Sequence, residues 1–376
     1  MLRKLNRKVG GEQLVLVDKK KLCLVIPSLQ AGGMERVMSE LAGYFCSRKE
    51  LEVHLVLYGK SPEFFYIVPD CVEIHEPKSV FHNKLRFYST VRRLLFLRKT
   101  IRLLAPNSVL SFGEYWNSFV LLALTGLPIP VYISDRCSPA KRYNALHNFL
   151  RRWLYPKAKG VIAQTEMAKV LYQRQFKNDN VAVIGNPIRL AKTHEGPKHN
   201  IVLTVGRLIE SKNHDKIIEL FCRLNRPDWK LLIVGGNALK QDNLSKLNTL
   251  VRSLNADANV EITGYRTNMD EIYRQSSIFV LASESEGFPN VIGEAMASAI
   301  PVIAFDCVAG PSEMITDGED GYLVPVGNYD EFSERLENLM EDLTLRQSLG
   351  LRAKESIRKF NVETIGSEYF NLLIRE

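Results

Sequence analysis

Short apolar runs alternate with longer stretches of helical periodicity along most of this 376-residue chain. Such alternation is typical of parallel β-sheets whose strands are joined by helices. The alternation occurs twice, and Gly185-Asn186-Pro187 with the polar run up to Asn200 separates the two series. Single domains commonly span roughly 100–200 residues, so the length suits two of them. The pattern therefore predicts an α/β chain of two Rossmann-like domains.

Each series contains six candidate strands. The first has them at 22–26, 53–57, 108–112, 131–134, 160–163 and 181–184, and the second at 201–205, 230–234, 260–262, 278–281, 302–304 and 322–324. Helices are expected at 34–47, 84–104, 140–155 and 362–374. The uncharged stretch 115–134 could span a bilayer by length, but Gly126, Pro128 and Pro130 interrupt it. A buried helix followed by a buried strand is the preferred interpretation.

Several metal and redox signatures are missing from the sequence. The cysteines lie far apart and form no C-x-x-C pair: Cys23, Cys46, Cys71, Cys137, Cys222 and Cys307. Free thiols in a reducing cytoplasm are the simplest expectation. There is no D-x-D, H-x-x-H, Walker A or G-x-S-x-G pattern. We therefore expect a site without metal or cofactor.

Basic residues concentrate in the first half of the chain. Residues 1–186 carry 29 Lys and Arg against 14 Asp and Glu, whereas residues 187–376 carry 21 against 28. The positive electrostatic potential of such a basic half suits binding to nucleic acid or to an anionic membrane surface. A solvated basic face without a partner is the alternative. No recognised nucleic-acid module is present, so nucleic acid is disfavoured.

The segment 84–104 would present part of this charge if it is helical. A helical wheel places five basic residues on one side: Lys84, Arg92, Arg98, Lys99 and Arg102. Apolar residues fall on the other side, namely Phe87, Leu94, Leu97, Ile101 and Leu104. That apolar side could be core or could insert into a membrane, and both alternatives stay open.

Two loops at expected strand ends carry groups suited to phosphate. Gly32-Gly33 precedes a helix, where backbone amides can approach an anion, although such a pair alone is more often a plain tight turn. Arg207 and Lys212 follow the strand 201–205. Ligands of open α/β sheets bind beyond the carboxyl ends of strands, so this pair could hold a diphosphate. Two solvated surface cations are the alternative.

A third loop, after the strand 278–281, holds Glu286 and, at the start of the next helix, Glu294. A carboxylate accepts two hydroxyl hydrogen bonds at once, which suits a ribose. Amides at the helix start suit a phosphate. Two solvated acids would explain poorly the Gly, Phe and Pro between them.

Together these segments resemble the family 4 retaining glycosyltransferases of GT-B fold. The motifs are AGGMER, GNPI, VGRLIESKN, EGFPNVIGEAMA with Glu286-x7-Glu294, and GPSEMITDGEDGYLVP, in this order across residues 21–376. The resemblance implies an acceptor-binding Rossmann-like domain at 1–186, with a basic extension at 1–20. It implies a nucleotide-sugar domain at 187–360 and a helix at 361–376 that crosses back to the first domain.

The resemblance also implies roles for individual residues. Arg207 and Lys212 match the cations on the donor diphosphate, Glu294 the ribose ligand and Glu286 the ligand of the sugar hydroxyls. The remaining donor-binding positions are Gly32, Gly33, Gly206, Gly287, Phe288, Asn290 and Val291. Arg136 stands where many members have a histidine, and we expect it to face the donor from the first domain. An Arg held by Asp135 for structure alone is the alternative. With Arg207, Lys212 and Glu286, Arg136 completes the expected catalytic set.

The expected activity is retaining, metal-independent transfer of a hexose from a nucleoside diphosphate sugar, with UDP as the favoured carrier. The expected acceptor is a polyprenyl-diphosphate-linked saccharide in capsule, O-antigen or lipopolysaccharide biosynthesis. This places the protein in the cytoplasm, peripherally on the inner membrane face, with its basic domain on anionic lipid. A nucleotide-sugar 2-epimerase of GT-B fold and a non-catalytic binding subunit are the alternatives.

Overall fold

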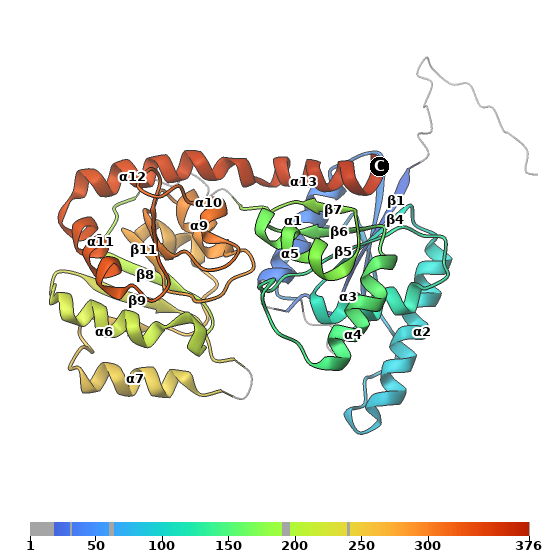
Figure 1. Cartoon of the computed structure of the whole chain (residues 1–376), viewed down its shortest axis with the longest axis horizontal. Coiled ribbons are helices and arrows are strands. Elements are labelled where there is room, and N and C mark those ends of the chain that lie inside the picture. The colour runs from blue at the N-terminus through green and yellow to red at the C-terminus, as the bar shows by residue number, and fades with distance from the viewer. Residues whose placement is uncertain (1–18, 31, 60–63, 190–195, 239–240, 376) are drawn as a thin grey trace, which may run out of the picture.

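The computed structural model describes residues 19–30, 32–59, 64–189, 196–238 and 241–375. It contains two parallel sheets, one of seven strands in the order β3-β2-β1-β4-β5-β6-β7 and one of six in the order β10-β9-β8-β11-β12-β13. We call the unit on the first sheet the N-domain and the unit on the second the C-domain. Figure 1 shows the two units side by side, with the last helices running across both. The predicted α/β class with two Rossmann-like units is confirmed.

The N-domain alternates strands and helices from residue 20 onward. Its elements are β1 (Lys20–Ile26), α1 (Gly33–Cys46), β2 (Leu51–Leu57), β3 (Val72–His75), α2 (Arg86–Leu104), β4 (Ser108–Phe112), α3 (Glu114–Leu124), β5 (Val131–Ser134), α4 (Ala145–Leu154), β6 (Gly160–Ala163), α5 (Glu166–Phe176) and β7 (Val181–Val183). Strands β4, β5 and β6 are buried along their whole length, as expected for parallel strands covered on both faces.

The C-domain repeats the pattern. Its elements are β8 (Ile201–Val205), α6 (His214–Leu224), β9 (Lys230–Val234), α7 (Asn243–Ser253), β10 (Val260–Ile262), α8 (Met269–Gln275), β11 (Ile278–Leu281), α9 (Asn290–Ala297), β12 (Val302–Phe305), α10 (Pro311–Met314), β13 (Tyr322–Val324), α11 (Tyr329–Glu341) and α12 (Leu343–Ser356). All six predicted strands are present, and β12 is one residue longer than expected.

The final helix returns to the N-domain, as predicted for this fold. Helix α13 (Val362–Phe370) begins at Asn361, whose side chain accepts a hydrogen bond from Thr364 N. Its buried residues Ile365, Tyr369 and Phe370 pack into the same apolar cluster as α1 and β1. The crossing therefore ties the end of the chain to the N-domain core (Figure 1).

Three details of the N-domain differ from the sequence-based expectation. Strand β3 was not predicted, because its sequence VEIH alternates polar and apolar residues at the edge of the sheet. The helix expected at 140–155 begins only at Ala145, where the Asn144 side chain caps it. On α2, Leu97 and Ile101 of the predicted apolar side are buried, whereas Phe87 of the same side is 84% exposed, so that side faces the core only in part. Its first turns project beyond the body of the domain (Figure 1).

The stretch 115–134 forms α3 and β5, as preferred from the sequence. Among the described residues, no helix combines the length and the apolar character that crossing a bilayer requires.

The expectation that all cysteines are free thiols is wrong for one pair. Cys46 ends α1 and Cys71 precedes β3, and a disulfide joins them with their Cα atoms 6.1 Å apart. The sequence hid this pair because 25 residues separate the two positions and only the return of the chain along β2 brings them together. Cys23, Cys137, Cys222 and Cys307 are free.

Candidate active site

A cavity of about 1010 Å³ opens where loops of the two domains face each other. Its N-domain wall includes Gly32, Gly33, Arg36 and Tyr66. Its C-domain wall includes most of the predicted donor positions: Gly206, Arg207, Lys212, Glu286, Phe288, Asn290, Val291 and Glu294. The structure thus brings together residues that are up to a few hundred positions apart. Gly287 and Arg136 are not part of the lining.

The loop after β8 positions the cationic pair. Lys212 lies in a single 3-10 turn (Glu210–Lys212), and its Nζ forms an ion pair with Glu286 Oε1. Both side chains are 13% exposed, so the pair is shielded from solvent. The Arg207 guanidinium has no side-chain hydrogen bond or ion pair within the described part of the chain, although it lines the same cavity. One cation is therefore held and the other is available to a ligand.

Glu294 is held from both domains. Arg36 of α1 forms an ion pair with Glu294 Oε1, and the Tyr273 hydroxyl donates to Glu294 Oε2 at 2.7 Å. The Arg36 and Glu294 side chains are 16% and 21% exposed. Sequence reasoning missed Arg36, although the segment AGGMER contains it. Its position in the first turn of α1, directly after Gly32-Gly33, was the available signal.

The backbones of the two domains approach each other closely at Gly287. A Cβ atom there would lie 2.9 Å from the Cys137 carbonyl carbon and 3.2 Å from the Arg136 carbonyl oxygen. Because side chains essentially never pack this closely to backbone, only glycine fits without a shift of one wall. Gly287 therefore places the loop that carries Glu286 against the loop that follows β5.

Arg136 turns away from the cavity. Its guanidinium donates to Asn186 Oδ1 and, at 2.9 Å, to the Tyr369 hydroxyl of α13, and it lies 3.4 Å from the centre of the Phe112 ring. Asn186 Nδ2 in turn donates to Asn290 Oδ1 across the cleft at 2.7 Å. Arg136 therefore reaches the C-domain wall through Asn186. Its predicted direct contact with the donor stays a prediction.

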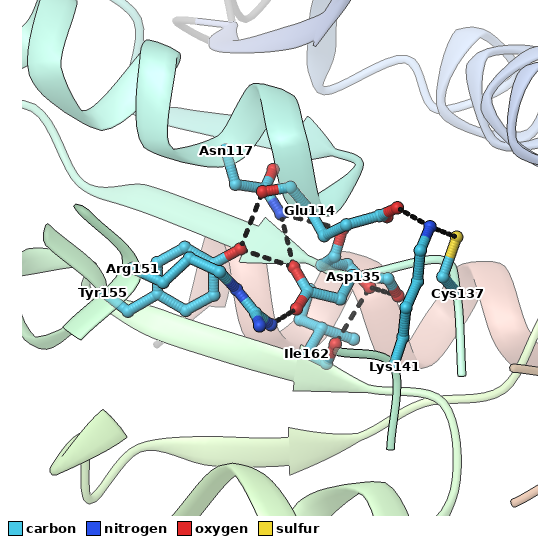
Figure 2. Close-up of polar contacts among 9 residues, drawn as sticks. Glu114, Asn117, Asp135, Cys137, Lys141, Arg151, Tyr155 and Ile162 are labelled. Atoms are coloured by element: carbon cyan, nitrogen blue, oxygen red, sulfur yellow. Dashed lines mark hydrogen bonds and ion pairs between the residues drawn. The ribbon is translucent and has the colours of Figure 1, made fainter. Parts of the chain in front are cut away.

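Asp135 does not hold Arg136 but anchors a buried network behind the loop, which Figure 2 shows. Arg151 of α4 pairs with Asp135 Oδ2, while Tyr155 and Asn117 donate to Asp135 Oδ1 at 2.6 and 3.0 Å. Asp135 and Arg151 are 2% and 3% exposed. The network fixes the start of the loop that meets Gly287.

Lys141 joins Glu114 of α3 to Cys137 on the other side of this loop (Figure 2). Burial, together with the adjacent Glu114 carboxylate, raises the pKa of the Cys137 thiol to about 12. A thiol with this pKa is protonated at neutral pH and is not a nucleophile. Cys137 therefore serves to shape the loop.

His214, at the start of α6, was also missed. It is 3% exposed and lies beside the backbone of Gly206 and Arg207. Burial and the nearby Lys212 ammonium lower its pKa to about 4. The imidazole is consequently neutral at pH 7 and adds no charge beside the cationic pair. It lines a second cavity of about 290 Å³ between α6 and α7, which lacks Arg207 and Lys212.

Two family models match adjacent parts of the chain. The model described as Glycosyltransferase Family 4 matches residues 31–192, and the model described as Glycosyl transferases group 1 matches residues 187–356. The two matches meet at the predicted linker and together cover both walls of the cavity.

Curated relatives match over nearly their full length. The amylovoran biosynthesis glycosyltransferase AmsD of Erwinia amylovora is 28% identical over 94% of this chain and 99% of its own. The N-acetylgalactosamine-N,N'-diacetylbacillosaminyl-diphospho-undecaprenol 4-alpha-N-acetylgalactosaminyltransferase of Campylobacter jejuni is 29% identical over 94% of this chain and all of its own. Among solved structures, Anabaena HepE in complex with UDP and glucose superposes with a TM-score of 0.80 at 17% identity, covering 94% of this chain and 99% of HepE.

Proposed function

Because this chain is a hexosyltransferase of glycosyltransferase family 4 with the GT-B fold, we propose that it transfers a hexose from a UDP-sugar, with retention and without a metal ion. We propose a polyprenyl-diphosphate-linked saccharide as its acceptor, in the assembly of a surface polysaccharide. The acceptor class follows the Campylobacter relative, whose name specifies an undecaprenyl diphosphate substrate. One observation carries the donor assignment: Arg207, Lys212, Glu286 and Glu294 line one cavity between the domains.

The cationic pair suits the leaving group. Charge builds up on the departing diphosphate as the glycosidic bond breaks, and fixed cations in a shielded site stabilise it most. Arg207 is available for the planar, two-point contact that guanidinium makes with phosphate oxygens. Lys212, held by Glu286, adds a second charge whose position is already set.

The two carboxylates suit the hydroxyls of the donor. An ionised carboxylate offers about four acceptor directions, and Arg36 and Tyr273 occupy two of those on Glu294. The remaining directions can accept ribose hydroxyls while both partners stay in place. Glu286 likewise keeps one oxygen free of Lys212 for a sugar hydroxyl. We assign no side-chain nucleophile, so retention would rest on positioning of donor and acceptor.

The acceptor and the membrane would be met by the N-domain. Helix α4 exposes Leu146, Phe149 and Trp153, which lie three and four residues apart and so share one face. The Lys157 ammonium lies 4.1 Å from the centre of the Trp153 ring. An exposed apolar stripe with adjacent cations fits the interface of an anionic membrane. This supports a peripheral location on the inner face of the cytoplasmic membrane.

Sedimentation with liposomes tests this surface. Binding to anionic vesicles should fall at high salt, and Phe149→Ser together with Trp153→Ser should reduce it further. The matched control is Leu254→Ser, an exposed apolar residue of the C-domain. Equal binding to neutral and anionic vesicles would contradict the electrostatic part of the proposal. Unchanged binding of the double variant would show that α4 is not the membrane-binding surface.

A thermal-shift panel of UDP-, GDP- and ADP-sugars tests the donor. A ligand raises stability with concentration by mass action, so a UDP-sugar should raise the melting temperature in a saturable way. A response to a GDP- or ADP-sugar alone would contradict the carrier assignment. No observation favours the 2-epimerase, and conversion of a UDP-sugar without acceptor would be needed to revive it.

A further inference from the structure

Four ionisable side chains gather on one face of the outer edge of the N-domain sheet. Glu52 and His54 are two residues apart on β2, and Glu73 and His75 are two apart on β3. The strands pair in parallel with His54 beside Glu73 and Val56 beside His75. Because residues paired across strands point to the same side, all four side chains share one face. None of them lines the donor cavity.

The ligand atoms of three of these residues converge on one point. His54 Nδ1 lies 3.1 Å from His75 Nε2 and 3.3 Å from Glu73 Oε2, and His75 Nε2 lies 3.7 Å from Glu73 Oε1. Zinc binds imidazole nitrogen and carboxylate oxygen at roughly 2.0–2.2 Å in a tetrahedron, whose corners are then about 3.3–3.6 Å apart. Although the two distances to Glu73 involve different carboxylate oxygens, all three separations lie within a few tenths of an ångström of that edge length.

Glu52 lies beside His54, on the side of the ring away from the cluster. Its Oε1 lies 3.0 Å from His54 Nε2, the ring nitrogen that points away from the cluster. At this orientation Nε2 forms no hydrogen bond with any described residue, but a proton on Nε2 beside the carboxylate would leave the Nδ1 lone pair directed at His75 and Glu73. A metal-binding histidine usually donates its other ring N–H to a carboxylate in this way.

We propose that His54, Glu73 and His75 bind a zinc ion, with Glu52 orienting His54 and water as the fourth ligand. The His54 and His75 side chains are 1% and 19% exposed, whereas Glu73 is 64% exposed. The site is thus closed on the sheet side and open to water on the other. Since β3 is the edge strand, the ion ties it to β2. This proposal is independent of the proposed function.

The expectation of a chain without metal rested on local patterns such as H-x-x-H and C-x-x-C. This cluster has neither, because its ligands come from two neighbouring strands at spacings of two. The alternative is a metal-free His–His hydrogen bond flanked by carboxylates. Direct metal binding distinguishes the two.

The experiment uses the full chain, stripped with chelator and dialysed, and titrated with Zn²⁺ against a chromophoric competitor. One equivalent should bind, and Co²⁺ should give the intense visible spectrum of a tetrahedral complex. His75→Ala and Glu73→Gln should each weaken binding at least 10-fold, and Glu52→Gln should weaken it roughly 10- to 100-fold. The exposed controls His82→Ala and Glu76→Gln should bind as the wild type does.

Absence of a saturable first equivalent would overturn the proposal. So would equal affinity in His75→Ala, Glu73→Gln and the controls, or binding lost in Cys71→Ser instead. The UDP-sugar thermal shift, measured on His75→Ala, separates this outcome from the donor assignment. It should persist when zinc binding is gone.

Discussion

The two walls of the cleft hold their polar groups differently. The C-domain wall presents charged side chains on the loops after β8 and β11, and Lys212 and Glu286 already pair within that wall. The N-domain wall contributes Gly32 and Gly33 together with aromatic and apolar side chains such as Tyr66, and its charged groups are Arg36 and Glu40. The difference suggests that the C-domain recognises the donor whereas the N-domain closes on it.

The largest effect is expected on the C-domain wall. Loss of a charge-assisted hydrogen bond costs roughly 1.5–3 kcal/mol, or about 10- to 150-fold. Lys212→Ala should lie at the upper end, because it also leaves Glu286 shielded and unpaired. Arg207→Ala should lower turnover within the same range. The control Lys216→Ala removes an exposed cation of α6 paired with Glu219, and its turnover should match the wild type. Wild-type turnover in both Lys212→Ala and Arg207→Ala would contradict the assignment of donor recognition to the C-domain wall.

The contact between the walls should give the next effect. Arg36→Ala, Glu294→Gln and the double variant form a cycle for donor binding. Because the side chains form an ion pair, their coupling should be about 1–3 kcal/mol. Additive losses would show that Arg36 and Glu294 act separately. Arg358→Ala is the control, since Arg358 is 57% exposed, pairs with Glu355 at 2.8 Å and does not line the cavity.

The N-domain loop should respond more weakly. Arg136→Ala should lower turnover roughly tenfold, the effect of one charge-assisted hydrogen bond, with an unchanged circular dichroism spectrum. If Arg136 acts by positioning Asn186 and thus Asn290, Asn186→Ala should produce a similar loss. If it contacts the donor directly, the Michaelis constant for the donor should rise in Arg136→Ala alone. Unchanged turnover in both variants would leave the pair purely structural.

The candidate site residues whose position at the cavity the sequence anticipated share one property. Strands such as β4 and β11 are buried on both faces, so their apolar runs are visible without the fold. Arg207, Lys212, Glu286 and Glu294 sit directly after such strands or at the helix that follows. Their place at one edge of one sheet therefore came from the strand pattern alone.

The residues that the sequence hid depend on partners from other elements. Arg36 meets Glu294 only because the two domains face each other. Arg136 turns toward Tyr369 because α13 crosses back beside it, which no local pattern reveals. His54 and His75 become neighbours only through the register of β2 and β3.

The smallest effect concerns pH and the shielding of the C-domain wall. Burial lowers the pKa of His214 to about 4, below its unfolded value of about 6.5. The unfolded chain therefore binds the proton first, and stability falls as pH drops from about 6.5 toward 4. When the pH is lowered from 7 to about 5.5, His214 should decrease the free energy of unfolding by about 1 kcal/mol. In denaturant unfolding, His214→Gln should lack this part of the dependence of unfolding free energy on pH. A dependence identical to that of the wild type would contradict the burial of a neutral His214.

The stereochemistry of a metal-free reaction tests the central claim most directly. The assay combines the UDP-sugar chosen by thermal shift, a polyprenyl-diphosphate-linked acceptor and excess EDTA. It uses His75→Ala, so that any metal requirement belongs to the cleft. The account predicts that transfer continues and that nuclear magnetic resonance finds the new bond with the anomeric configuration of the donor. Inverted product, or complete loss of transfer that added Mg²⁺ or Mn²⁺ restores, would contradict it.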